Sequence, residues 1–102
     1  MEDQIPIQGI KKYVLPIASK YLDLATYRLL VFGSRATGTA EPTSDIDIGI
    51  QGPGLVPRHL LAALREDIKE TPLIYKVDVV DLSSVSDDFR HLAISNAKII
   101  SP

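Results

Sequence analysis

Two aspartates, Asp45 and Asp47, begin an apolar run, and this short pattern constrains the chain more than any other feature. Alternate residues of a β-strand point to the same face, so a strand over residues 45–50 would place the two carboxylates side by side. The isoleucines of the run would then point to the opposite face. Two carboxylates on one face are costly unless a cation lies between them.

A glycine-serine pair ends the preceding apolar run, and ten residues separate it from the first of these aspartates. Gly33 and Ser34 offer unobstructed backbone N–H groups and a hydroxyl, which suit phosphate oxygens. Mg²⁺ is typically held by one or two carboxylates together with substrate phosphates. The combination predicts metal-assisted chemistry on a nucleoside triphosphate. Asp-x-Asp alone would more simply be an aspartate-rich turn, and the glycine-serine pair argues against that interpretation.

Hydrophobic periodicity divides the chain into the helices and strands of one α/β domain. The pattern predicts helices over residues 10–24, 34–37, 57–70 and 84–95. It predicts strands over residues 27–32, 45–50 and 75–82, with a short edge strand over 98–101. Pro16 predicts either a kink or a break in the first helix. Residues 1–8 are expected to form a loosely held arm.

The lengths of the connections predict how the strands pair. The short excursion between the first two strands favours an antiparallel pair, which would bring the first two aspartates beside the glycine-serine pair. The long connection to the third strand contains a helix and favours a parallel pair. Asp78, early in that strand, can then reach the other two aspartates, whereas Asp81 points to the other face. We expect a mixed sheet of three to four strands, with helices mainly on one face and the aspartates on the more open face.

Other side chains receive a less specific interpretation. Arg35 lies in the turn after the glycine-serine pair and either meets a phosphate or points to solvent. The third helix carries a charged face that is expected to be solvated and without function: Arg65, Glu66, Asp67 and Lys69. The fourth helix carries apolar residues that are expected to face the core: Phe89, Leu92 and Ala93.

Composition excludes several other classes of function. The 102 residues include no cysteine, which rules out disulfides, thiolate zinc sites and cysteine nucleophiles. A formal net charge of -2 argues against a dedicated nucleic-acid binder. No apolar stretch approaches the length of a membrane span, and the acidic N-terminus lacks a signal-peptide pattern. A single cytoplasmic domain is therefore expected.

The string Phe-Gly-Ser, followed after ten residues by Asp-Ile-Asp-Ile, resembles the signature of the DNA polymerase beta-like nucleotidyltransferase superfamily. The fuller string GSRATG…SDIDIGI, with VDVVDL downstream, is similar to the minimal nucleotidyltransferase (MNT) domains. These domains include antitoxins that are paired with HEPN-domain toxins. The resemblance covers residues 27–82 closely. It implies the polymerase-beta-like nucleotidyltransferase fold, with residues 1–102 forming one minimal domain.

The resemblance also implies roles for particular residues. Gly33 and Ser34 would contact nucleotide phosphates, and Arg35 in the same turn is a third candidate for nucleotide contact. The catalytic ligands of one or two Mg²⁺ ions would be Asp45, Asp47 and Asp78. For the antitoxin branch, the resemblance implies transfer of AMP from ATP to a tyrosine of the HEPN toxin, which would inactivate the toxin.

Two other functions stay open at this point. The chain could neutralise a toxin by binding alone, although its intact aspartate trio argues against a vestigial metal site. It could instead act on a small molecule such as an antibiotic, if a homodimer builds the acceptor site. The short chain leaves no room for a domain that selects the acceptor, which favours an acceptor supplied by a partner protein.

Overall fold

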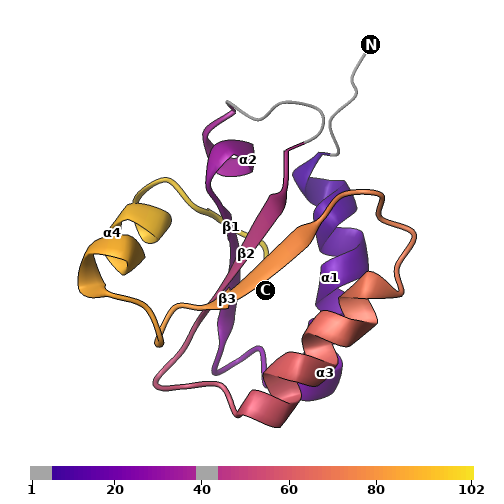
Figure 1. Ribbon diagram of the computed structural model, residues 1–102, viewed down its shortest axis with the longest axis horizontal. Helices are drawn as coiled ribbons and strands as arrows, with labels where there is room; N and C mark the ends of the chain where they lie inside the picture. The colour runs from indigo at the N-terminus through magenta and orange to yellow at the C-terminus, as the bar shows by residue number, and fades with distance from the viewer. Residues whose placement is uncertain (1–5, 39–43) are drawn as a thin grey trace.

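The computed structural model describes residues 6–38 and 44–102. Figure 1 shows a sheet through the middle of the molecule, with helices on both sides of it. The strands are β1 (Arg28–Phe32), β2 (Ile46–Gln51), β3 (Val77–Asp81) and β4 (Lys98–Ile99). The helices are α1 (Ile7–Tyr21), α2 (Ser34–Thr37), α3 (Arg58–Lys69) and α4 (Asp87–Ser95).

The four strands form one mixed sheet in the order β3-β2-β1-β4. β1 pairs with β2 and with β4 in antiparallel fashion, whereas β2 and β3 run parallel. The α3 helix forms the crossover between the two parallel strands, as the long connection requires. The predicted pairing of the three main strands and the predicted edge strand are confirmed.

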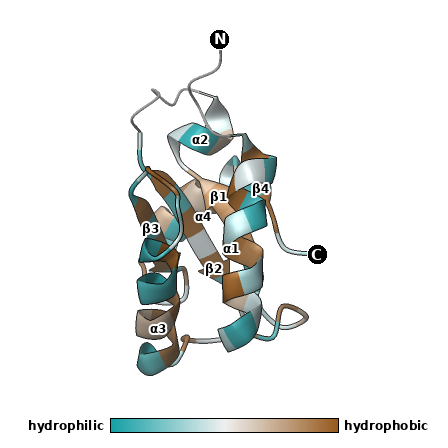
Figure 2. Cartoon of the chain, turned by 90° about the vertical axis from the view of Figure 1, so that its right-hand side faces the viewer, coloured by the Kyte–Doolittle hydropathy of each residue, from teal (hydrophilic) through white to brown (hydrophobic). Residues whose placement is uncertain are grey.

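The main core lies between the sheet and the helices α1 and α3, which pack against the same face (Figure 2). Ile46, Ile48 and Ile50 of β2 are 0% exposed and occupy its centre. These alternate residues share one face, and burying each of them contributes roughly 1.5–3 kcal/mol. The isoleucine side of β2 is therefore fully buried in the core, and Asp47 lies on the opposite side of the strand.

The α4 helix covers only part of the opposite face. Ala93 is buried there, but Phe89 is 42% exposed and Leu92 is 73% exposed. The expectation that Leu92 faces the core is wrong, whereas Phe89 is partly exposed but packs its ring against the buried Phe32. Arg90 lies on the inner side of α4, where its Nε donates a hydrogen bond to Leu82 O at 2.7 Å. This contact turns the side of α4 that carries Arg90 and Ala93 toward the sheet, so Leu92 points outward.

The α1 helix runs without interruption through Pro16. Proline in a helix removes one backbone hydrogen bond, and Pro16 lies on the exposed side of α1, where water can replace that bond. The helix begins at Ile7 and so includes the last two residues of the predicted arm, whereas residues 1–5 lie outside the described ranges. No helix in the described ranges is both long and apolar enough to cross a membrane.

Two charged residues of α3 make structural contacts, so the expectation of a purely solvated face is wrong for them. Lys20 Nζ and Tyr21 OH donate hydrogen bonds to Asp67 Oδ2 at 2.7 and 2.6 Å, which joins α1 to α3. Arg65 reaches the edge of the sheet, where its Nε and Nη2 donate to Val79 O at 3.2 and 2.6 Å. Both contacts depend on the elements that pack beside α3, and the sequence pattern of α3 alone does not reveal these neighbours.

The hydrogen bond from Lys20, followed by that from Tyr21, lowers the pKa of Asp67. A carboxyl group with a lowered pKa in the folded chain adds stability above its ordinary pKa, and that stability is lost as the pH falls through the lowered value. We expect Asp67→Asn to lower the melting temperature at pH 7, with the difference from wild type shrinking toward about pH 3. Thermal unfolding followed by circular dichroism across this pH range measures both effects.

Glu66→Gln is the matched control for this prediction. Glu66 lies next to Asp67 on α3, but its carboxylate is 3.8 Å from Lys69 and both side chains are at least 70% exposed. Exposed ion pairs of this kind contribute little, so the control should unfold like wild type at every pH. A difference between Asp67→Asn and wild type that stays constant with pH would contradict the assignment.

Candidate active site

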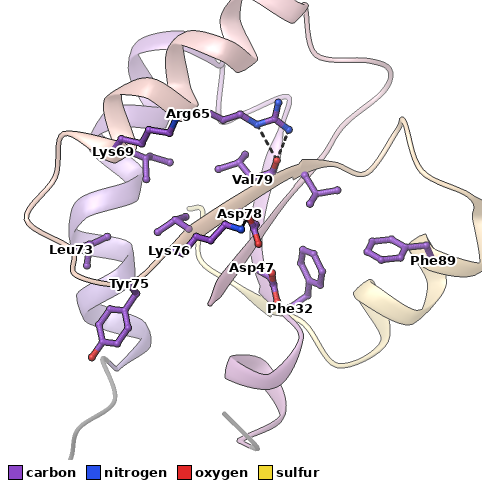
Figure 3. Close-up of a pocket in the computed structure, with 13 residues that line it drawn as sticks. Phe32, Asp47, Arg65, Lys69, Leu73, Tyr75, Lys76, Asp78, Val79 and Phe89 are labelled. Atoms are coloured by element: carbon purple, nitrogen blue, oxygen red, sulfur yellow. Dashed lines mark hydrogen bonds and ion pairs between the residues drawn. The ribbon is translucent and has the colours of Figure 1, made fainter. Parts of the chain in front are cut away.

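The register of the sheet places Phe32, Asp47 and Asp78 in one row across three neighbouring strands. Phe32 is the partner of Asp47 in the antiparallel pair, and Asp47 is the partner of Asp78 in the parallel pair. Cα partners on neighbouring strands point to the same face of a sheet, so the two carboxylates lie side by side, as Figure 3 shows. The expected placement of Asp78 beside Asp47 is confirmed.

Asp45 lies directly before β2, which begins at Ile46, so the predicted strand begins one residue too early. Its side chain is exposed, in contrast to the half-buried Asp47. The backbone that follows Asp45 is nevertheless fixed, because Ile46 N–H donates a hydrogen bond to Lys76 O at 2.9 Å. Asp45 therefore stands at the point where β2 first joins β3.

The charge on Asp47 is unfavourable in the folded chain. Burial raises the pKa of Asp47, and the negative charges of Asp78 and Asp45 raise it further. Lys76 Nζ lies 3.8 Å from Asp78 Oδ1, but these side chains are 71% and 42% exposed, so the pair is weak. A cation bound between Asp47 and Asp78 would therefore interact favourably with both carboxylates.

The glycine-serine turn lies directly against Asp47. Gly33 has a φ of +74°, and a methyl group on its Cα would lie 2.5 Å from Asp47 Oδ2. Glycine is required here both for the backbone conformation and for the space that the carboxylate occupies. Gly33 O accepts hydrogen bonds from the backbone N–H groups of Ala36 and Thr37 at 3.0 and 3.2 Å, which starts α2. The expected proximity of the turn to Asp47 is confirmed.

Arg35 is buried, with 9% of its surface exposed, which excludes the predicted alternative of a solvent-exposed side chain. Its Nη2 donates a hydrogen bond to Ser44 O at 2.6 Å. The guanidinium carbon lies 4.6 Å from the centroid of the Tyr75 ring. Contact of Arg35 with a nucleotide stays a prediction.

A groove of about 830 Å³ runs along β3 and includes Asp47 and Asp78 in its lining. At one end the rings of Phe32 and Phe89 meet edge to face, with centroids 6.0 Å apart and an interplanar angle of 85°. The groove also carries basic side chains: Arg65, Lys69 and Lys76.

Sequence reasoning missed two parts of this groove. Lys76 could have been found, because it precedes Asp78 by two positions in an extended segment and so shares its face. The ring of Phe89 could not, because its contact with Phe32 depends on where α4 packs against the sheet.

The donor chemistry of the site fits a hard divalent cation. Asp45, Asp47 and Asp78 offer only carboxylate oxygens, which Mg²⁺ prefers, and the raised pKa of Asp47 reports a charge that a cation would stabilise. Within residues 6–38 and 44–102, however, no three acidic, histidine or cysteine side chains are already arranged to hold a metal ion. A bound ion would have to draw the carboxylates together by side-chain rotation, which the exposed Asp45 permits most easily.

Residues 16–101 match the family described as "Polymerase beta, Nucleotidyltransferase", and the chain belongs to this family. A protein of Haemophilus influenzae named "Probable protein adenylyltransferase MntA" is 37% identical to the chain over 68 residues. The matched segment covers 65% of this chain and 58% of that protein, so the chain spans less than two thirds of the length of that relative.

Solved structures of the same architecture include a toxin-antitoxin with AMP-PNP, with a TM-score of 0.71 and 22% identity over 88% of this chain and 71% of the other. For a tri-AMPylated Shewanella oneidensis HEPN toxin in complex with an MNT antitoxin, the TM-score is 0.68 and the identity 19%, over 92% of this chain and 71% of the other. For a candidate minimal nucleotidyltransferase, the TM-score is 0.69 and the identity 21%, over 92% of this chain and 95% of the other. These similarities confirm the expected minimal nucleotidyltransferase fold.

Gly33→Ala should destabilise the chain and displace the carboxylate of Asp47. The strained backbone alone costs about 1–3 kcal/mol of unfolding free energy, and the added methyl group meets Asp47 Oδ2. Urea unfolding measures the first effect, and carboxyl ¹³C NMR measures the altered titration of Asp47.

Gly38→Ala is the control that separates the effect of backbone strain from the effect of the contact between the added methyl group and Asp47. Gly38 has a φ of +80°, but a methyl group there would meet nothing within 4 Å. This control should lose about 1–2 kcal/mol of stability and leave the titration of Asp47 unchanged. Equal NMR shifts in the two variants would contradict the close approach of Gly33 to Asp47.

Asp47→Asn should make the folded chain more stable than wild type at pH 7. A carboxyl group whose pKa is raised by folding supports the folded state fully below its ordinary pKa, and that support is lost as the pH rises through the raised value. The advantage of the variant should therefore vanish below about pH 4 and grow toward neutrality. Urea unfolding at a series of pH values measures this advantage. Asp88→Asn, on the exposed start of α4, is a control that gains no stability.

Proposed function

We propose that the chain is an Mg²⁺-dependent nucleotidyltransferase that transfers AMP from ATP to a tyrosine hydroxyl of a HEPN-type toxin, and so acts as its antitoxin. The observation that carries this proposal is the pairing of Asp47 with Asp78 across the parallel strands, beside the Gly33 turn. The reaction consumes ATP, which places the proposed activity in the cytoplasm.

The three aspartates are proposed to hold one or two Mg²⁺ ions: Asp45, Asp47 and Asp78. Mg²⁺ would supply positive charge that neutralises the triphosphate as negative charge develops on it. Binding would also offset the burial and the repulsion that together raise the pKa of Asp47. The unfavourable charge of the resting site is thus explained by a ligand that the site has to bind.

Gly33 and Ser34 are proposed to contact the phosphates of ATP. Gly33 is exposed, and the absence of a side chain there lets the turn lie directly against the carboxylate of Asp47. Backbone N–H groups and a serine hydroxyl are suitable donors for phosphate oxygens. This arrangement would hold the triphosphate and the metal-binding carboxylates in contact with each other.

Asp78 is proposed to serve the acceptor, because its side chain is 42% exposed and lines the groove along β3. The hydroxyl oxygen would form a bond to the α-phosphorus, the bond to the β-phosphate oxygen would break, and pyrophosphate would leave. The hydroxyl proton would pass to Asp78 or through it to solvent. The edge-to-face pair of Phe32 and Phe89 beside the carboxylates suits an aromatic acceptor such as tyrosine.

The comparisons support a protein acceptor. The name of the Haemophilus influenzae relative denotes a protein adenylyltransferase, and the solved structures of similar fold include an AMPylated HEPN toxin in complex with an MNT antitoxin. A second candidate is an antitoxin that neutralises by binding alone. The carboxylates are not already arranged to hold a metal ion among the described residues, and this observation favours the second candidate.

To test the proposal, the chain is mixed with Mg²⁺, α-labelled ATP and the HEPN-type protein encoded by the neighbouring gene. We expect label on a tyrosine of that protein. Asp47→Asn and Asp78→Asn should each lower the rate of transfer by at least about 100-fold, as expected when charge stabilisation of the transition state is removed. Asp88→Asn, on the exposed start of α4, should retain wild-type activity.

Two results would favour the other functions. Neutralisation of the toxin that survives Asp45→Asn combined with Asp47→Asn, without transfer of label, would support binding alone. Label that appears only on an added small molecule, such as an antibiotic, would support a small-molecule nucleotidyltransferase.

A further inference from the structure

Arg35 joins three segments of the chain at the edge of the proposed active site. It belongs to α2, which follows the glycine-serine turn. Its Nη2 donates a hydrogen bond to Ser44 O at 2.6 Å, and its guanidinium carbon lies 4.6 Å from the centroid of the Tyr75 ring. Ser44 leads into β2 and Tyr75 leads into β3, so one side chain contacts the approaches to both aspartate-bearing strands.

Asp45 is the residue that these contacts fix. It lies outside β2, so the regular alternation of a strand does not determine where its side chain points. On one side, Arg35 holds the carbonyl of the peptide bond that joins Ser44 to Asp45. On the other side, Ile46 N–H donates to Lys76 O at 2.9 Å. The backbone of Asp45 is therefore held immediately before and immediately after the residue.

Arg35 is poorly explained as a contribution to stability alone. It is 91% buried, yet its Nε and Nη1 have no hydrogen-bond partner among the residues that the structure describes. Buried donors without partners reduce the stability of a fold, so a guanidinium that keeps two of them calls for another reason. The planar group suits this place because its edge can donate to Ser44 O while its face stacks on Tyr75.

We infer that Arg35 is a positioning residue that orients Asp45 for cation binding through Ser44 O and the Tyr75 ring, rather than a ligand of the nucleotide phosphates. The inference rests on the proposed function, since it assumes that Asp45 binds a cation. It separates Arg35 from Gly33 and Ser34, which lie beside it in the sequence. It also explains how Asp45, which is exposed and lies outside β2, could bind the same cation as Asp47 and Asp78.

The test is Mn²⁺ affinity, with Mn²⁺ as the probe for the Mg²⁺ site, measured by electron paramagnetic resonance of the free ion with and without a non-hydrolysable ATP analogue. Arg35→Met keeps an unbranched apolar stem and removes the guanidinium, and with it the donors, the charge and the contact with the Tyr75 ring. Loss of positioning should weaken Mn²⁺ binding by about 10- to 100-fold, the usual effect of removing a group that orients a metal ligand. A purely electrostatic role predicts the opposite, because removal of a positive charge would strengthen cation binding.

Arg90→Met is the matched control, because Arg90 also donates to backbone carbonyls, at Leu82 and Val85, but near the far end of β3. It should leave Mn²⁺ affinity unchanged even if stability falls. Tyr75→Leu removes the ring and should weaken Mn²⁺ binding in the same direction as Arg35→Met, whereas Tyr75→Phe keeps the ring and should not. This second pair keeps the inference testable if Arg35→Met fails to fold.

The outcomes separate the inference from the proposed function. Wild-type protein that binds no Mn²⁺ under either condition would overturn both. Normal Mn²⁺ binding by wild type and unchanged or stronger binding by Arg35→Met would overturn the inference alone. Weaker binding of the metal-free ATP analogue by Arg35→Met, measured by titration calorimetry, with Mn²⁺ affinity unchanged, would show that Arg35 is a phosphate ligand instead.

Discussion

The parallel pairing of β2 with β3 forces two carboxylates together, and much of the molecule can be understood from that constraint. Asp47 and Asp78 are direct partners in this pair, and burial and repulsion raise the pKa of Asp47. A fold selected for stability alone would avoid this arrangement, because the charged form of Asp47 is disfavoured in it. Active sites commonly accept such a cost, since a site that is destabilised when empty is well suited to bind a ligand of opposite charge.

The surrounding elements keep that pair in place and accessible. The isoleucines of β2 pack against α1 and α3 on one face, which leaves Asp47 on the other face beside Gly33. The α4 helix covers only part of that second face, so the groove along β3 stays open next to the carboxylates. The rigid, buried side of the sheet thus supports the chemistry proposed for its open side, as is usual for sites built on strands.

Local sequence was a good guide wherever the determining interactions lie within one element or between consecutive ones. The alternation in β2 predicted which side of the strand carries Asp47, and the long helical connection predicted the parallel partner. The pattern was a poor guide for α4, because the orientation of Leu92 depends on the contact of Arg90 with Leu82 O. It was equally poor for Asp67, whose partners lie on α1, 46 and 47 residues away in the chain.

The sequence by itself determined the order of the elements, the pairing of the main strands and the identity of the acidic residues. These follow from periodicity and connection length, which act over a few residues or one crossover. Only the tertiary structure decided that Arg35 is buried between Ser44 and Tyr75 and that Phe89 meets Phe32 at one end of the groove. Such contacts join segments that are distant in the chain, and their geometry depends on how whole elements pack, which no local pattern encodes.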